Sequence, residues 1–112
     1  MNQEENMIIR CLSSLSSFER DVLLATLNVP KGKVTTYKRI AIRIGRPKAC
    51  RAVGNALHRN PLPRTIPCHR VVRSDGIIAG DPEEVSFRRR LLEQEGIPVV
   101  GNRVKISEKI LY

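Results

Sequence analysis

Apolar residues recur at the spacing of an α-helix in several stretches of this chain, and residues typical of helix ends bound each stretch. The first stretch predicts a helix from about Ser17 to Leu27. A capping-box pattern, Ser16-x-x-Glu19, precedes it, and Pro30 lies just beyond its end. Residues 1–15 are polar apart from a short apolar patch and leave three possibilities open: a helix, a strand or a loose segment.

Two short helices are predicted in the middle of the chain. Thr35 and Thr36 can cap the first, which runs from Tyr37 to Arg43. Gly45 ends it, and the second helix spans roughly Lys48 to His58. A tight turn containing Gly and Pro joins the two, which is the pattern of a helix-turn-helix. Many such helix pairs do not bind DNA, so the pattern alone does not identify a function.

The second of these helices has small residues at Cys50, Ala52 and Gly54, where a surface helix usually has long side chains. Small residues let a backbone approach another surface closely. Arg51 projects among them. Two interpretations remain open, because this face can pack against another protein element or enter a groove of DNA.

The C-terminal part of the chain predicts one more helix and a hairpin. Asp81 and Pro82 are typical of the N-cap and first position of a helix, and apolar periodicity continues to a stop at Gly96. A hairpin around a Gly-Asn turn follows between Pro98 and Ile106, and Ile110–Tyr112 are expected to pack back onto the body. The predicted fold is therefore mostly α with a small β-hairpin, in a winged-helix-like helix-turn-helix domain.

The chain of 112 residues suits a single domain, which we place at residues 16–112 behind an N-terminal extension of residues 1–15. No apolar run is long enough to cross a membrane, and the polar N-terminus is not a signal peptide. Three cysteines without close pairing argue against a disulfide framework and favour a reducing cytoplasm. Neither Cys-x-x-Cys nor His-x3-His spacing occurs, so we expect no metal site. We also expect no cofactor and a monomer.

Charge is distributed very unevenly along the chain. The net charge is +9, yet all 11 acidic residues lie outside a basic block that runs from Val22 to Ser74. A solvated surface normally mixes both signs, because charges of one sign repel each other. The basic block therefore favours a polyanionic partner, most simply nucleic acid, over a basic protein without such a partner.

A thiol, an imidazole and a guanidinium follow one another inside an apolar segment, Ile66 to Val72, where a strand or buried turn normally has Val or Ile. They belong to Cys68, His69 and Arg70. A thiolate is a strong nucleophile, and a nearby cation or His lowers the pKa of a thiol. A free cysteine is also often a small buried apolar residue, and the dipeptide alone favours that interpretation.

Three motifs in order resemble those of the O6-alkylguanine-DNA alkyltransferases. They are RAVGNAL at 51–57, NPLP at 60–63 and IPCHRVV at 66–72, and the similarity extends from about Phe18 to Gly96. Pro-Cys-His-Arg-Val after Asn-Pro-x-Pro is highly specific. The resemblance implies the half of these proteins that binds DNA and reacts. It also implies that their usual N-terminal domain, which holds zinc in some members, is absent.

The resemblance implies a reaction and roles for five residues. An alkyl group on O6 of guanine in double-stranded DNA, with O4 of thymine as a further candidate, would move to Cys68. His69 would take the thiol proton through a water, and Glu95 would orient the imidazole. The guanine must leave the base stack to react. Arg51 is expected to fill the vacated space, and Tyr37 to push the phosphate that drives the rotation.

The resemblance also implies contacts to DNA and one internal link. Lys38, Arg46 and Ser74 match residues that contact phosphate or sugar. Asn60 matches the asparagine that links the turn after the second helix to the cysteine. The second helix would enter the minor groove, where base identity is read poorly, as suits a protein that must find damage in any sequence.

The loop that precedes the last helix departs from the family pattern. Asp81 stands where these proteins have a tyrosine that stacks on the flipped base. We expect this to remove one wall of the base pocket, which is a loss on the order of 1–3 kcal/mol, and to add negative charge near it. Two other hypotheses remain: a non-reacting alkyltransferase-like sensor that recruits repair factors, and a plain basic winged helix with an inert Cys68. The presence of the cysteine favours the enzyme.

Overall fold

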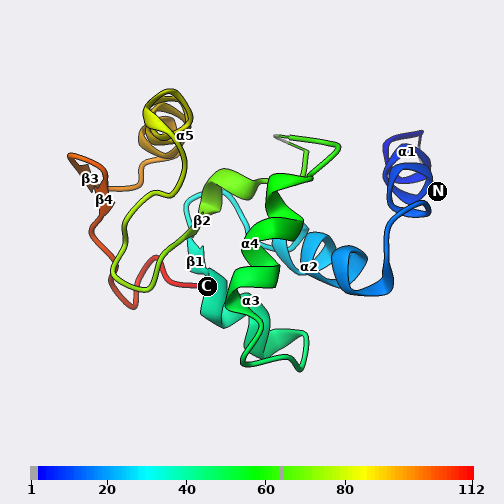
Figure 1. Ribbon diagram of the computed structural model, residues 1–112. Helices are drawn as coiled ribbons and strands as arrows, with labels where there is room; N and C mark the ends of the chain where they lie inside the picture. The colour runs from blue at the N-terminus through cyan, green and yellow to red at the C-terminus, as the bar shows by residue number, and fades with distance from the viewer. Residues whose placement is uncertain (1–2, 64) are drawn as a thin grey trace.

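The computed structural model describes residues 3–63 and 65–112 (Figure 1). The elements follow one another as α1 (Gln3–Leu12), α2 (Ser17–Leu27), β1 (Thr35–Thr36), α3 (Tyr37–Arg43), α4 (Cys50–His58), the 3-10 turn η1 (Cys68–Arg70), β2 (Val71–Val72), α5 (Pro82–Gln94), β3 (Val99–Val100) and β4 (Arg103–Val104). The predicted mostly α fold with a small hairpin is confirmed. Helix α4 starts two residues later than predicted, and α1 occupies the segment that the sequence left open.

Local hydrogen bonds explain where three of the helices begin. At α2 the capping box is present, since the Ser16 hydroxyl accepts from the Glu19 N–H and the Glu19 carboxylate accepts from the Ser16 N–H. The side chains of Thr36 and Asp81 cap α3 and α5 in the same way. Helix α4 has no side-chain cap at Ala49, so its position depends on the turn before it and on packing.

Two apolar clusters form the core. The first joins α2, α3 and α4, and its buried members include Val22, Leu23, Ile40, Val53, Ile66 and Val71. The second lies beneath α5 and the hairpin, and its buried members include Val34, Val72, Ile78, Leu92 and Val104. Successive residues of a strand point to opposite faces. The two residues of β2 therefore belong one to each cluster, and β2 lies at the boundary between them.

A short parallel pairing of β1 with β2, which the sequence did not predict, fixes that boundary. Thr35 lies opposite Val71 and Thr36 opposite Val72. The C-terminal segment runs beside β1, where the Val34 N–H donates to the Ile110 carbonyl at 2.8 Å, so the expected packing back is confirmed. The β3–β4 hairpin is also confirmed. Within the described residues, no helix combines the length and apolar character needed to span a membrane.

Candidate active site

Cys68 begins the 3-10 turn η1, directly before β2. Its N–H donates to the Ile66 carbonyl at 2.8 Å, and the Arg70 N–H donates to the Pro67 carbonyl at 2.9 Å. The turn continues into β2, whose pairing with β1 holds it from the other end. The half-buried thiol is therefore carried on a backbone that is tied down on both sides.

Asn60 ties the loop after α4 to this turn. Its side-chain amide donates to the Ile66 carbonyl at 2.9 Å, and its side-chain oxygen accepts from the Leu62 N–H at 2.9 Å. Both contacts lie within the loop that leads from α4 to Cys68. The geometry thus places Asn60 where the resemblance expected a link between helix and cysteine.

The buried His69 and the half-buried Glu95 form a pair behind the cysteine. Nε2 of His69 lies 2.9 Å from Oε2 of Glu95, which stands at the C-terminal end of α5. A carboxylate can only accept a hydrogen bond, so Nε2 carries the proton. In the neutral imidazole, Nδ1 is then the nitrogen with a free lone pair.

The electrostatics of this pair favour a neutral imidazole and an ionised carboxylate. Burial lowers the pKa of His69 below its usual value, although the hydrogen bond to Glu95 opposes this. Burial would raise the pKa of Glu95, but hydrogen bonds from Arg70 and His69 outweigh it and hold that pKa below its usual value. At neutral pH the site therefore contains a base that is free to accept a proton.

Arg70 is a member of this cluster that the sequence-based site did not include. Its Nε and Nη2 donate to the two oxygens of Glu95 at 2.9 and 2.7 Å, and its Nη1 donates to the Val29 carbonyl at 2.8 Å. Glu95 is thus clamped in a bidentate arrangement that fixes its orientation toward His69. The position of Arg70, directly after the Cys-His dipeptide, was the signal available in the sequence.

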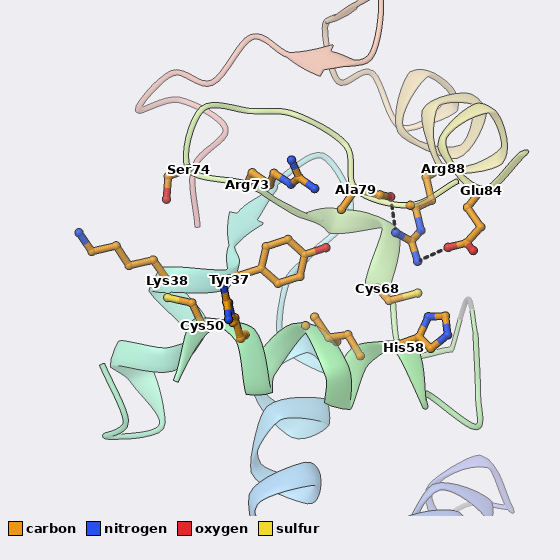
Figure 2. A pocket seen from close by; sticks show the side chains of 14 residues that line it. Tyr37, Lys38, Cys50, His58, Cys68, Arg73, Ser74, Ala79, Glu84 and Arg88 are labelled. Carbon is orange, nitrogen blue, oxygen red and sulfur yellow. Dashed lines mark hydrogen bonds and ion pairs between the residues drawn. The ribbon is translucent and has the colours of Figure 1, made fainter. Parts of the chain in front are cut away.

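A cavity of about 510 Å³ opens beside Cys68 (Figure 2). It lies between α3 and α4 on one side and the segment from β2 to α5 on the other. The residues that line it are Tyr37, Lys38, Cys50, Arg51, Gly54, Leu57, His58, Cys68, Arg73, Ser74, Ala79, Gly80, Glu84 and Arg88.

The cavity brings together five of the nine residues singled out from the sequence, namely Cys68, Tyr37, Lys38, Arg51 and Ser74. His69, Glu95 and Asn60 do not line it and support Cys68 from behind. Arg46 is exposed in the turn between α3 and α4, also outside the cavity. Within the described residues, no group of three or more His, Cys, Asp and Glu side chains could hold a metal ion.

The predicted small face of α4 is wrong at one position. Cys50 and Gly54 line the cavity together with Arg51, but Ala52 lines a separate hollow beside the start of α2. Residues four apart lie on one side of a helix, whereas residues two apart point about 200° away from each other. The face of α4 that borders the cavity is therefore formed by Cys50, Arg51, Gly54, Leu57 and His58.

The prediction that Asp81 would place negative charge at the pocket is corrected by the course of the loop. Asp81 is exposed, and its carboxylate accepts from the Glu84 N–H at 2.9 Å as the cap of α5. Glu84 and Arg88, one turn apart on α5, line the cavity instead. Their i, i+4 spacing was visible in the sequence, but which face of the helix would meet Cys68 was not.

Comparison with known proteins gives a consistent set of matches. Residues 17–97 match the family described as "6-O-methylguanine DNA methyltransferase, DNA binding domain". The methylated-DNA--protein-cysteine methyltransferase of Homo sapiens is 46% identical over 81 residues, covering 71% of this chain and 39% of that protein. Its counterpart in Methanothermobacter thermautotrophicus is 42% identical over 86 residues, covering 77% and 48%. The chain thus spans about half the length or less of these relatives.

Solved structures extend the similarity to the fold. Mycobacterium tuberculosis OGT in complex with DNA has a TM-score of 0.69 and 40% identity, covering 72% of this chain and 50% of that one. S. pombe Atl1 in complex with damaged DNA containing O6-carboxymethylguanine has a TM-score of 0.76 and 30% identity, covering 88% and 96%. The second match spans nearly the whole of the similar protein.

Proposed function

This chain belongs to the 6-O-methylguanine DNA methyltransferase family, and we propose that it repairs DNA by moving the alkyl group of an O6-alkylguanine to its own Cys68. The observation that carries the proposal is the arrangement at the cysteine. The thiol lines a cavity, and the adjacent imidazole is held against an ionised carboxylate that Arg70 clamps. This is the layout of a nucleophile, a base and a group that orients the base.

The transfer forms one bond and breaks one bond. The sulfur of Cys68 attacks the carbon attached to O6, the S–C bond forms, and the electron pair of the C–O6 bond passes to the guanine. Nδ1 of His69 takes the thiol proton through a water, because Nε2–H already donates to Glu95. The guanine returns to its keto form with a proton at N1, which balances the proton lost by the thiol, and no cofactor is needed.

Double-stranded DNA is the partner in this proposal. Lys38, Arg51 and Arg73 line the cavity and can meet phosphates, while the exposed Arg46 extends the basic surface past the α3–α4 turn. A base inside the duplex cannot reach Cys68 unless it is flipped out. Arg51 and Tyr37 line the same cavity, and in this proposal Arg51 fills the space that the flipped base leaves.

A second candidate function, binding of alkylated DNA without transfer, rests on a specific observation. Atl1 is similar to this chain over 96% of its own length, whereas the match covers 48% and 39% of the two methylated-DNA--protein-cysteine methyltransferases named above. The charged wall at Glu84 and Arg88 also differs from the stacking tyrosine that the resemblance implied. The intact Cys68–His69–Glu95 arrangement favours repair over this candidate.

Intact-mass measurement after incubation with duplex DNA containing O6-methylguanine tests the proposal. The wild type should gain one methyl group, peptide mapping should place it on Cys68, and Cys68→Ala should gain nothing. Cys50→Ala is the matched control, because it removes the other thiol that lines the cavity and should still be methylated at Cys68. Tight binding of the damaged duplex by the wild type without a mass gain would reject repair and establish the sensor.

A further inference from the structure

On the α5 side of the cavity, the Arg88 guanidinium is paired with a carboxylate, Glu84, that another anion could replace. Nη1 of Arg88 donates to the Ala79 carbonyl at 2.6 Å, and Nη2 lies 3.4 Å from Oε2 of Glu84. The Arg88 side chain is 18% exposed, whereas that of Glu84 is 37% exposed. The guanidinium is thus anchored to the backbone, while the carboxylate beside it is loosely held and reaches solvent.

The guanidinium lies close to the reacting groups. Figure 2 shows Arg88 reaching from α5 toward the part of the cavity that Cys68 borders. Burial is the largest cause of both shifts, since it raises the pKa of Tyr37 and lowers the pKa of His69. The positive charge of Arg88 adds a smaller contribution that lowers the pKa of each group. Arg88 is therefore within electrostatic range of groups on either side of the thiol.

The charge of the cavity lining decides which ligands suit the cavity. The cationic side chains of the whole lining are Lys38, Arg51, Arg73 and Arg88, and its acidic side chain is Glu84. An anionic substituent that reached Arg88 would meet a net positive surface. Two carboxylates near Arg88 would repel it: that of Glu84, whose side chain is 37% exposed and can turn to solvent, and that of Asp81, which is exposed at the start of α5. A neutral methyl group gains nothing from this arrangement.

We propose that Arg88 is a specificity-determining residue. It binds a carboxylate carried on the O6 substituent of guanine, and this carboxylate takes the place of the Glu84 carboxylate. The proposal rests on the function proposed above. A planar guanidinium binds a carboxylate in a bidentate, charge-assisted arrangement, which the 3.4 Å contact with Glu84 does not achieve. The bond changes of the transfer are the same as for methyl, with a carboxymethyl group moving to sulfur.

Equilibrium binding with Cys68→Ser protein tests the proposal without requiring transfer. The probes are identical duplexes with O6-carboxymethylguanine or its neutral isostere, O6-carbamoylmethylguanine, so that the comparison isolates one charge. We expect about tenfold tighter binding of the carboxymethyl duplex. Arg88→Gln in the same background should bring the ratio close to one. Glu84→Gln, which removes the competing carboxylate, should raise the ratio.

The Arg89–Glu93 pair supplies a matched control on the same helix. It is also an i, i+4 pair, at 2.9 Å, but it lies outside the cavity, so Glu93→Gln should leave the ratio unchanged. A ratio of one or less for the parent protein would overturn the proposal, as would a ratio that survives Arg88→Gln. If Arg88→Gln does not fold, the binding ratios of the Cys68→Ser protein and of its Glu84→Gln variant still decide whether the proposal holds.

The mass measurement on protein with an intact Cys68 separates this proposal from the proposed function. Methyl transfer without a carboxylate preference in binding means that repair holds and the role of Arg88 fails. A carboxylate preference that depends on Arg88, in a protein that transfers neither group, means that the role of Arg88 holds and repair fails.

Discussion

In the wall of the cavity formed by α3 and α4 two helices pack directly on each other, whereas the wall formed by α5 presents charged side chains to the cavity. Ile40 of α3 and Val53 of α4 are buried in the same cluster, and Gly54 faces the ring of Tyr37. Opposite them, Arg88 is bonded to a loop carbonyl and paired with Glu84. In our proposals the first wall supplies the groups that meet DNA, and the second wall supplies Arg88, which meets the substituent on the base.

This difference separates two tasks of a base-flipping protein. Every adduct requires the base to be extruded from the duplex, and this step suits a wall formed by packed helices. Discriminating between substituents requires contacts near Cys68, and in our proposal Arg88 on α5 makes one of them. We therefore expect changes in the α3–α4 wall to act on all duplex substrates alike, and changes in the α5 wall to act on some substrates more than others.

The largest expected effect comes from Arg51→Ala on the α3–α4 wall. Transfer from duplex DNA should slow roughly 100-fold, since extruding a base costs a few kcal/mol, while transfer from free O6-benzylguanine should change little. Single-turnover rates on both substrates measure this. Arg59→Ala is the control, because Arg59 lies just beyond α4 and outside the cavity. Equal losses on duplex and free base would reject the role of Arg51 in extrusion.

The loops that lead into the two walls should differ in stability. Gly45 (φ +77°) precedes α4 and has open space around it, so Gly45→Ala should cost about 1 kcal/mol for backbone strain alone. Gly80 (φ +125°) precedes α5, and a Cβ there would lie 2.9 Å from Cβ of Glu84. Gly80→Ala should therefore cost about 2–3 kcal/mol. Urea unfolding of both variants checks the order, and a larger loss at Gly45 would contradict it.

Acid should lower the free energy of unfolding through the His69–Glu95 pair that lies behind the cavity. The folded-state pKa of His69 is below its usual 6.5, mainly through burial, so the unfolded chain binds more protons as the pH falls through that value. The free energy of unfolding should therefore drop between about pH 7 and pH 5. The lowered pKa of Glu95 adds a further loss below its usual 4.5. In urea titrations, His69→Gln should show a smaller drop from pH 7 to 5 than the wild type. An equal drop in both would exclude His69 as its source.

The smallest effect compares the two ion pairs of α5. Glu93→Gln breaks a half-exposed pair and should lower the free energy of unfolding by about 0.3–0.5 kcal/mol. Glu84→Gln should cost no more, because its contact with Arg88 is longer, at 3.4 Å. Thermal unfolding of the two variants tests this. A loss well above 1 kcal/mol at Glu84 would mean that its carboxylate is not loosely held.

The sequence by itself predicted helices α2 to α5, the side-chain caps of α2, α3 and α5 and the hairpin, and it singled out Cys68 as the candidate nucleophile. Caps such as Ser16 and Asp81 act over three or four residues, so a local pattern is sufficient to find them. The motif around Cys68 was specific for the same reason, since its order along the chain carries the information.

Only the tertiary structure decided what surrounds the cysteine. The clamp of Arg70 on Glu95 joins residues 25 apart in the chain, and the parallel pairing of β1 with β2 joins segments separated by two helices. The rotation of α4 excluded Ala52 from the cavity, and the rotation of α5 brought in Arg88. Helical periodicity tells which residues share a face, but packing between distant elements decides which face meets the site.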